Sequence, residues 1–499
     1  YKVFLPHHAE PGRVAIDDTN HAWVVLRRTG GVAVIDLASG AFETKTACDA
    51  PRGIAFDKTS ESVRVACADG TFVTFPLAGG DVSTKKLGRD LRDVVVTSNG
   101  VHVSSFRAAK VVDVTTGAEQ SVGGNLVWRA LVAPPSADGC PTCGDETIAA
   151  VAQEATPGQV NPQPGGYGGA SAGPAGDCAA HSILATRLTL VGRGSVQLPE
   201  AVLPVDLATN GREYVVVAAG NAYTPDLPQL FILFSAMLSE GDKGCIPTVH
   251  GNVPGQAVAA AFDGADELLV QTREPAALHI MTEDRRRVWK TIELPGDTRA
   301  DTGHAIFHSN AGGFLACASC HAEGGDDGHV WEFVGMGPRR TPRLEGTVED
   351  TQPYHWTGDM HDLRDLVDHV FVERMSGPKV DDDHLDALRS FLFALPVPKP
   401  LRAPDDQSLR GRATFEQRCT SCHAGGHLTN NQTVDVGTGA AFQVPSLTGV
   451  AWRASWLHDG CAKTLADRFR PECGGAQHAV TQDLSADQIA DLIAFLETL

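Results

Sequence analysis

Residues 317–321 read Cys-Ala-Ser-Cys-His, and residues 419–423 repeat the pattern as Cys-Thr-Ser-Cys-His. In this spacing two thiols reach the two vinyl groups of one porphyrin, and the adjacent imidazole is placed to bind the iron. A zinc site is the competing interpretation, but zinc would require two further ligands near each copy. The sequence therefore predicts two covalently bound haem c groups. Their attachment residues and proximal ligands would be Cys317, Cys320, His321, Cys419, Cys422 and His423.

A helical pattern follows each motif and, like it, recurs after about one hundred residues. Residues 385–395 and residues 489–499 both place apolar side chains at the spacing of one helix face. The proline-rich stretch 396–404 between the copies is typical of a stiff, extended linker. We therefore expect two all-α cytochrome-c-like domains, the first over residues 301–400 and the second over residues 401–499.

Alignment of the two copies predicts the second axial ligand of each iron. His321 lies 54 residues before Met375, and His423 lies 55 residues before His478. Met375 and His478 thus occupy equivalent positions and are the candidate ligands on the far side of the first and second iron. A thioether raises a haem potential relative to a second imidazole, so electrons would pass from the second haem to the first.

Other side chains compete for these positions. Met336 and Met360 are alternatives in the first copy, where a lone methionine among apolar residues more often packs than binds metal. The second copy contains no methionine. Its other histidines are His427, which follows the motif too closely to reach the far face, and His458.

Four of the seven tryptophans fall in the region of the two motifs, namely Trp331, Trp356, Trp452 and Trp456. Aromatic side chains in such a region usually pack on the porphyrin or in the core. Trp356 is the candidate for a catalytic role, as an electron relay between the redox centres.

Residues 1–300 show a different pattern, in which short alternating strands recur at intervals of about forty residues. The phrases that begin at Val14 and Ile54 each contain three or four such strands. Sheets of this kind bury both faces only by stacking on their neighbours. The pattern predicts an all-β propeller of six or seven blades, with residues 1–5 closing the ring, in preference to a β-sandwich. The Pro- and Gly-rich stretch 154–177 predicts a surface insertion.

The composition excludes several partners. A formal charge of −20 argues against nucleic acid and anionic lipid, because an acidic surface repels both. No stretch of about eighteen apolar residues occurs, so no membrane span is expected. The first residues lack the basic and apolar segments of a signal peptide. With haem c attached, we expect an exported bacterial protein, periplasmic or extracellular, whose numbering begins after processing.

Eight of the twelve cysteines lie outside the two motifs. In an exported protein an even remainder favours disulfides, and Cys461 with Cys473 is the best single pair. Cys140-Pro-Thr-Cys143 could alternatively be half of a zinc site or a redox dithiol. Because Gly144 follows this pair in place of histidine, it is not a third haem site.

Five phrases carry a family resemblance: Cys419-Thr-Ser-Cys-His-Ala-Gly-Gly-His-Leu-Thr-Asn, Val444-Pro-Ser-Leu-Thr-Gly-Val, Leu457-His-Asp-Gly-Cys-Ala-Lys-Thr-Leu, Thr341-Pro-Arg-Leu and Pro353-Tyr-His-Trp-Thr-Gly-Asp. With them, residues 301–499 resemble the bacterial di-haem cytochrome c peroxidase and MauG family. The resemblance implies two facing domains, a first haem that meets peroxide and a second haem that feeds it electrons. Near the first motif, His304, His308 and Glu323 are then candidates for handling protons. The family's electron-transfer haem takes methionine or tyrosine, whereas this second copy offers histidine.

Three functions from different classes follow from these patterns. The first is electron transfer, in which the propeller docks a redox partner protein, donor or acceptor, and both haems relay electrons. The second is a peroxidase-type or MauG-type oxidoreductase that reduces hydrogen peroxide at the first haem. The third is a binding protein whose propeller recognises a ligand while the haems are accessory. The sequence leaves open whether calcium accompanies the haems.

Overall fold

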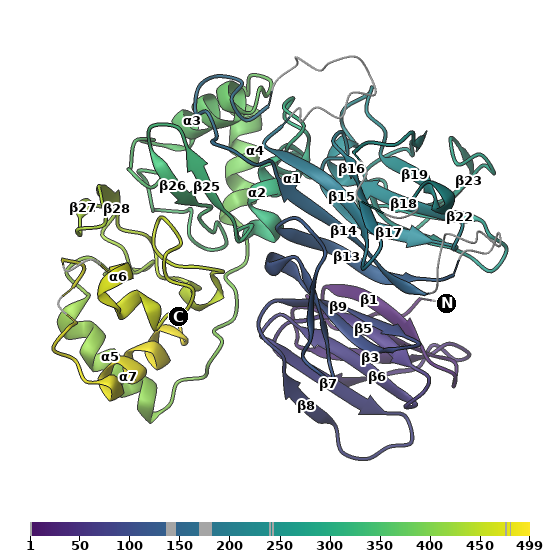
Figure 1. The fold of residues 1–499 in the computed structure, drawn as a ribbon, viewed down its shortest axis with the longest axis horizontal. Coiled ribbons are helices and arrows are strands. Elements are labelled where there is room, and N and C mark those ends of the chain that lie inside the picture. Colours follow the sequence, from purple (N-terminus) through teal and green to yellow (C-terminus); the bar gives the residue numbers. More distant parts are fainter. Residues whose placement is uncertain are drawn as a thin grey trace. The chain divides into compact units, whose positions relative to one another are not determined.

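The computed structural model describes residues 2–135, 146–168, 182–238, 241, 244–474, 477–479 and 481–499 (Figure 1). Within these residues the chain forms two compact units. The first contains residues up to 155 together with 184–299, and the second contains 156–168, 182–183 and 300–499. None of the described helices is long and apolar enough to cross a membrane.

The first unit contains six four-stranded antiparallel sheets, each built from four consecutive strands. The first three are β1 (Pro11–Ile16), β2 (His21–Leu26), β3 (Gly31–Asp36) and β4 (Phe42–Thr46); β5 (Pro51–Asp57), β6 (Ser62–Cys67), β7 (Thr71–Pro76) and β8 (Ser83–Lys86); and β9 (Leu91–Thr97), β10 (Gly100–Ser105), β11 (Lys110–Asp113) and β12 (Glu119–Ser121). The next three are β13 (Leu126–Ala133), β14 (Thr147–Ala155), β15 (Leu184–Leu190) and β16 (Gly194–Leu198); β17 (Pro204–Thr209), β18 (Glu213–Ala218), β19 (Leu230–Phe234) and β20 (Val249–Gly251); and β21 (Ala257–Phe262), β22 (Leu268–Thr272), β23 (Ala277–Met281) and β24 (Val288–Glu293). The predicted propeller is confirmed, with six blades.

The predicted closing strand at residues 1–5 is wrong. Residues 2–10 form no strand, because every blade is already complete with four consecutive strands. Val3 and Leu5 instead pack against the buried side chains of the first blade. Their apolar character therefore covers a blade and does not pair with one.

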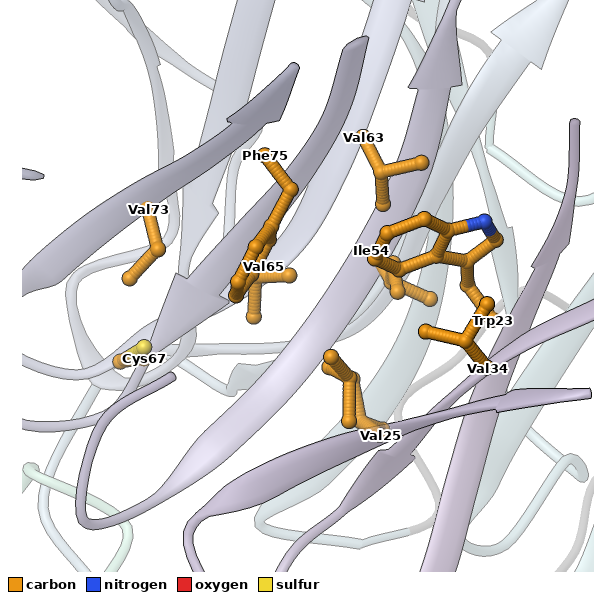
Figure 2. Packing of buried hydrophobic residues seen from close by; sticks show 10 residues of the cluster. Trp23, Val25, Val34, Ile54, Val63, Val65, Cys67, Val73 and Phe75 are labelled. Carbon is orange, nitrogen blue, oxygen red and sulfur yellow. The ribbon is translucent and has the colours of Figure 1, made fainter. Parts of the chain in front are cut away.

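Neighbouring blades pack through buried apolar side chains. Between the first two blades, the ring centres of Trp23 and Phe75 lie 5.7 Å apart, among valines and Ile54 (Figure 2). The indole N–H of Trp23 donates to a carboxylate oxygen of Asp17 at 2.8 Å, so its one polar group is satisfied. A β pattern without this stacking would leave one sheet face exposed to water.

Disulfides account for several of the remaining cysteines. The predicted Cys461–Cys473 bridge is confirmed, and Cys48–Cys67 links the segment between β4 and β5 to the end of β6. Cys245 is also disulfide-bonded. The four cysteines of the two motifs form no disulfide. Cys140-Pro-Thr-Cys143 lies outside the described residues.

Four charged side chains from the first strands of four blades form a closed ring of ion pairs. Arg13 contacts Asp93 at 3.5 Å and Asp206 at 2.8 Å. Arg129 contacts the same two carboxylates at 2.6 and 3.4 Å. Burial alone would raise the pKa of Asp93, but Arg129 and Arg13 together hold it below its usual value. The ring thus links β1, β9, β13 and β17.

Asp93→Asn is expected to destabilise the first unit by roughly 2–4 kcal/mol, because Arg13 and Arg129 would share one carboxylate. Since folding lowers the pKa of Asp93, the stabilisation is present above the unfolded-state value of 3.8 and is lost as the pH falls through the lower folded-state pKa. Urea unfolding followed by circular dichroism measures the change. The control Asp18→Asn, at an exposed pair with Lys58, should cost less than about 0.5 kcal/mol. If both variants lost the same free energy of unfolding, the ring of ion pairs would not stabilise the first unit as stated.

The second unit repeats one helix pair. In each copy a helix before the motif packs on a helix after it: α1 (Thr302–His308) on α4 (Asp382–Phe393), and α5 (Asp406–Arg418) on α7 (Ala486–Leu496). The short elements of this unit are α2 (Cys317–Cys320), η4 (Ala322–Gly324), β25 (Val330–Phe333), β26 (Gly337–Arg340), α3 (Leu363–Leu366), η5 (Val367–Arg374), β27 (Thr433–Asp435), β28 (Ala441–Gln443), η6 (Val450–Trp452), η7 (Asp467–Phe469) and α6 (Pro471–Gly474). Three further turns, η1 (Phe106–Ala108), η2 (Ala219–Asn221) and η3 (Ser235–Met237), belong to the propeller.

Both helix crossings depend on a glycine. A Cβ at Gly411 would lie 1.8 Å from the carbonyl oxygen of Asp491, and one at Gly303 would lie 2.2 Å from that of Ala387. Any side chain would therefore push the helices apart. One turn further on, two phenylalanine rings pack in each copy, at 5.0 Å for Phe415 and Phe495 and at 5.3 Å for Phe307 and Phe391.

The segment between β14 and β15 belongs to the second unit over its described part, residues 156–168. Val160 is buried beside β25, where its N–H donates to the carbonyl of Glu332 at 2.7 Å and its own carbonyl accepts from Val334 at 3.0 Å. The N–H of Tyr167 donates to the last carbonyl of η5 at 3.0 Å. The predicted surface insertion is therefore, over these residues, an integral part of the second unit.

Candidate functional site

The second motif fixes the orientation of its histidine. Nδ1 of His423 donates to the carbonyl of Leu428 at 3.0 Å, which leaves Nε2 available to a metal. Burial lowers the pKa of His423 to about 4. The imidazole is therefore neutral at neutral pH, and this is the form that binds iron.

The structure brings His478 to this histidine. The ring centres of His423 and His478 lie 6.4 Å apart, with their planes inclined by 32°. Two imidazoles that share one metal ion, each with a metal–nitrogen distance of about 2 Å, have ring centres roughly 6 Å apart. Burial lowers the pKa of His478 to about 3, and its buried Nδ1 has no hydrogen-bond partner within the described part of the chain. The two residues fit a bis-imidazole iron site.

The first motif repeats the local geometry of the second. Nδ1 of His321 donates to the carbonyl of Pro342 at 3.0 Å, so that Nε2 is again available. Burial lowers the pKa of His321 to about 4 and raises that of Cys317 to about 12. The motif therefore offers a neutral imidazole and two uncharged thiols, which suit thioether attachment of a porphyrin better than a thiolate metal site.

Met375 is buried directly after the π-helical segment η5. The insertion holds this end of η5, because Tyr167 binds its last carbonyl and the hydroxyl of Ser376 donates to the carbonyl of Gly168 at 2.9 Å. Burial raises the pKa of Tyr167, and Cys320 acts in the same direction while Arg374 opposes it. The insertion thus reaches the surroundings of the first motif. Ligation by Met375 stays a prediction.

Trp356 lies where the two copies of the second unit meet. Its indole N–H donates to the carbonyl of Arg340 at 2.9 Å, and its own carbonyl accepts from Gln443 of the second copy at 2.8 Å. Its ring centre is 6.3 Å from that of His458 and 6.4 Å from that of Phe442. Trp356 therefore contacts both copies, as a relay must, while its catalytic role stays a prediction.

The candidate proton-handling groups are separated. His304 and His308 stack at 4.0 Å on α1, and both rings pack against Phe391 of α4. These contacts make the two histidines part of the helix crossing. Glu323 lies instead in η4, two residues after His321.

A group of buried charges was not predicted from the sequence. Arg340, Arg343 and Arg453 belong to the second unit and are largely shielded from water, as are Asp326 and Asp327. The one signal in the sequence was that Arg340 directly precedes the phrase Thr341-Pro-Arg-Leu and Arg343 lies within it. Their burial depends on contacts between the copies, which no local pattern reveals.

Residues 406–496 match the family model described as cytochrome C oxidase, cbb3-type, subunit III. This region is a cytochrome c domain. The matched residues include α5, the second motif, His478 and α7. A cytochrome c domain implies covalently bound haem c, and the neutral imidazole pair fits such a group. Attachment at Cys419 and Cys422 stays a prediction. The match does not extend to residues 301–400, so the haem predicted there and the peroxidase family remain predictions.

Three solved structures are similar to parts of the chain. Hydrazine synthase of Kuenenia stuttgartiensis, pressurised with xenon, is 22% identical over 40% of this chain and 86% of its own, with a TM-score of 0.36. The WD40 β-propeller domain of Doa1 is 12% identical over 58% and 85%, with a TM-score of 0.37, and streptogramin B lyase is 11% identical over 59% and 86%, with a TM-score of 0.41. These similarities are too weak to carry a functional conclusion. No curated protein matches the chain.

Val160→Ala tests whether the insertion stabilises the unit that contains the cytochrome c domain. Loss of two buried methyl groups should lower the free energy of local unfolding of β25 and η5 by about 1–2 kcal/mol. The two elements should therefore open roughly 5- to 30-fold more often. Hydrogen exchange with mass spectrometry measures this in peptides from both elements. Val82→Ala, at an exposed position of the propeller, is the matched control and should change nothing. Unchanged exchange of β25 in the Val160 variant would contradict the assignment of the insertion to this unit.

Proposed function

We propose that the chain is an exported electron-transfer protein that carries two covalently bound haem c groups. The observation that carries this proposal is the pair of imidazoles in the cytochrome c domain, with ring centres 6.4 Å apart. Two nitrogen ligands close both axial positions of an iron, which leaves no open position for a small molecule and favours electron transfer. Haem c, when bound, supplies a one-electron couple.

The residues of the cytochrome c domain hold this couple in a defined environment. Cys419 and Cys422 would attach the porphyrin, and His423 and His478 would bind its iron. The carbonyl of Leu428 fixes the ring of His423. Desolvation of these partly buried imidazoles lowers the pKa of both, so they stay neutral at neutral pH.

The first motif supports a second haem by the same features. Its histidine also donates Nδ1–H to a backbone carbonyl, and α1 and α4 cross at a glycine as α5 and α7 do. Met375 is proposed as the second ligand of this iron. A thioether would raise its potential, so that electrons pass from the second haem to the first, with Trp356 as the proposed relay.

The propeller is proposed as the surface that docks the redox partner. A formal charge of −20 favours a partner with a positively charged surface and a docking rate that falls with added salt. The disulfides Cys48–Cys67 and Cys461–Cys473 agree with an oxidising compartment. They support export to the periplasm or beyond.

Peroxidase-type reduction of hydrogen peroxide at the first haem is the second candidate function. It is favoured by η5, the π-helical segment Val367–Arg374 that ends directly before Met375. π-helical turns are rare and occur often at functional sites. In this alternative Met375 would be displaced, and the first site would open to peroxide.

His478→Met tests the imidazole pair. Replacing one imidazole by a thioether should raise the reduction potential of one haem and introduce the near-infrared band of methionine-ligated ferric haem. Spectroelectrochemical titration of the full chain measures both. His427→Met is the matched control, because His427 contributes its backbone carbonyl, which accepts from Leu447 at 3.2 Å. If the His478 variant behaved like this control, the proposed ligand pair would be wrong.

Met375→Ala separates the two candidate functions. If the chain transfers electrons, the wild-type protein should give a fully low-spin spectrum and should not consume peroxide in the presence of a reduced donor. In Met375→Ala the first iron would lose its second ligand, so this variant should show a high-spin component and consume peroxide. Met336→Ala, at a half-exposed alternative position, should resemble the wild type. Rapid peroxide consumption by the wild-type chain would favour the peroxidase.

A further inference from the structure

Three arginine side chains are buried in the second unit where its two copies meet. Arg340 is 5% exposed, Arg453 is 8% exposed and the side chain of Arg343 is 7% exposed. Arg340 ends β26 and donates its N–H to the carbonyl of His458 at 2.7 Å and its Nε–H to that of Leu457 at 2.8 Å. This arginine therefore joins the first copy to the cytochrome c domain.

The positive charge of this group is incompletely compensated. Arg343 pairs with Asp326 at 3.4 Å and with Glu345. Within the described ranges, no carboxylate lies at ion-pair distance from Arg340 or Arg453. The guanidinium of Arg340 donates to backbone carbonyls alone.

Arg453 is the least satisfied of the three. One of its N–H groups donates to the carbonyl of Ser446, and its buried Nε has no hydrogen-bond partner among the described residues. Burial and the neighbouring Arg340 and Arg343 lower its pKa well below the usual value. A guanidinium keeps its charge in proteins, and a buried, unpaired charge is strongly destabilising. A bound anion would therefore stabilise this group of arginines by pairing with the guanidinium of Arg453.

The buried carboxyl of Asp327 does not supply this anion. Burial raises its pKa to about 7, so its charge is only partial at neutral pH. Its oxygens already accept from the indole N–H of Trp331 at 3.0 Å and from the backbone N–H of His329 at 3.0 Å. Asp326 also attracts Arg340 and Arg453, but it already pairs with Arg343 at 3.4 Å. The positive charge of the three arginines is therefore only partly compensated by the described carboxylates.

We propose that Arg453 and Arg340 form a buried carboxylate-binding site for the propionates of the haem attached at Cys419 and Cys422. This inference rests on the proposed haem attachment. Arg453 donates to the carbonyl of Ser446, and the next residue, Leu447, donates its N–H to the carbonyl of His427 at 3.2 Å, so the site adjoins the second motif. A haem carries two propionates, and guanidinium groups bind carboxylates through paired N–H donors. The covalently attached group thus brings its own counter-charge.

The site has a consequence for electron transfer. Positive charge beside the propionates stabilises the reduced form of the haem, because reduction adds one negative charge in a medium of low dielectric constant. The guanidinium of Arg340 also lies 4.8 Å from the ring centre of Trp356. The same arginines therefore tune the second haem and adjoin the proposed relay.

Arg453→Gln in the full-length haem protein tests the site. The resonance Raman bending band of the propionates should shift, and the reduction potential of one haem should fall. Arg453→Lys keeps the charge but loses the planar pair of donors, so it should retain most of the potential while still shifting the band. Arg412→Gln removes the same charge from the exposed face of α5, where Arg412 pairs with Glu416, and should leave both readouts unchanged.

Intact-mass measurement of each variant distinguishes the outcomes. If two haems are attached and Arg453→Gln leaves the propionate band and the potential unchanged, the site is wrong. A chain without haem at Cys419 and Cys422 overturns the proposed function instead. A wild-type potential that shifts on removal of small anions and returns with inorganic phosphate would show a solvent anion in the site, which also overturns the inference. If Arg453→Gln fails to fold, an unshifted band in Arg453→Lys is decisive against it.

Discussion

The imidazoles of His423 and His478 face each other at a separation that one iron ion can bridge, and the cytochrome c domain is built to keep that separation. The position of His423 is set by its motif, and the orientation of its ring is set by the hydrogen bond to the carbonyl of Leu428. On the other side, Arg468 donates to the carbonyl of His478 at 2.8 Å. The close crossing of α5 and α7 at Gly411 packs the helix before the motif against the last helix of the domain.

The same burial explains both the histidines and the arginines. A low dielectric environment disfavours any charge, which keeps the imidazoles of His423 and His478 neutral and ready to bind metal. Arginine does not escape this cost by losing its proton, so Arg340 and Arg453 require an anion. The proposed haem, with its iron and its two propionates, would meet both requirements within one site. In the propeller, by contrast, the polypeptide supplies the counter-charge itself, because two aspartates pair with two arginines in the ring of ion pairs.

Local patterns in the sequence predicted the propeller, the haem attachment motif of the cytochrome c domain and the Cys461–Cys473 disulfide, because each depends on spacing along the chain. Contacts between distant segments were not predictable. Apolar residues at the N-terminus suggested a closing strand, but they cover a blade that is already complete. Glycine content identified residues 156–168 as irregular without showing that Val160 pairs with β25. The burial of Arg453 likewise depends on the meeting of two copies, which composition does not encode.

Electron paramagnetic resonance of the oxidised, full-length protein tests the proposed pair of imidazole ligands, because the signal of a ferric haem depends on both axial ligands and on the angle between their planes. Ligation by His423 and His478 should give a low-spin bis-imidazole signal of rhombic shape, in keeping with ring planes inclined by 32°. A high-spin signal from the cytochrome c domain, or the absence of any haem signal, would contradict it.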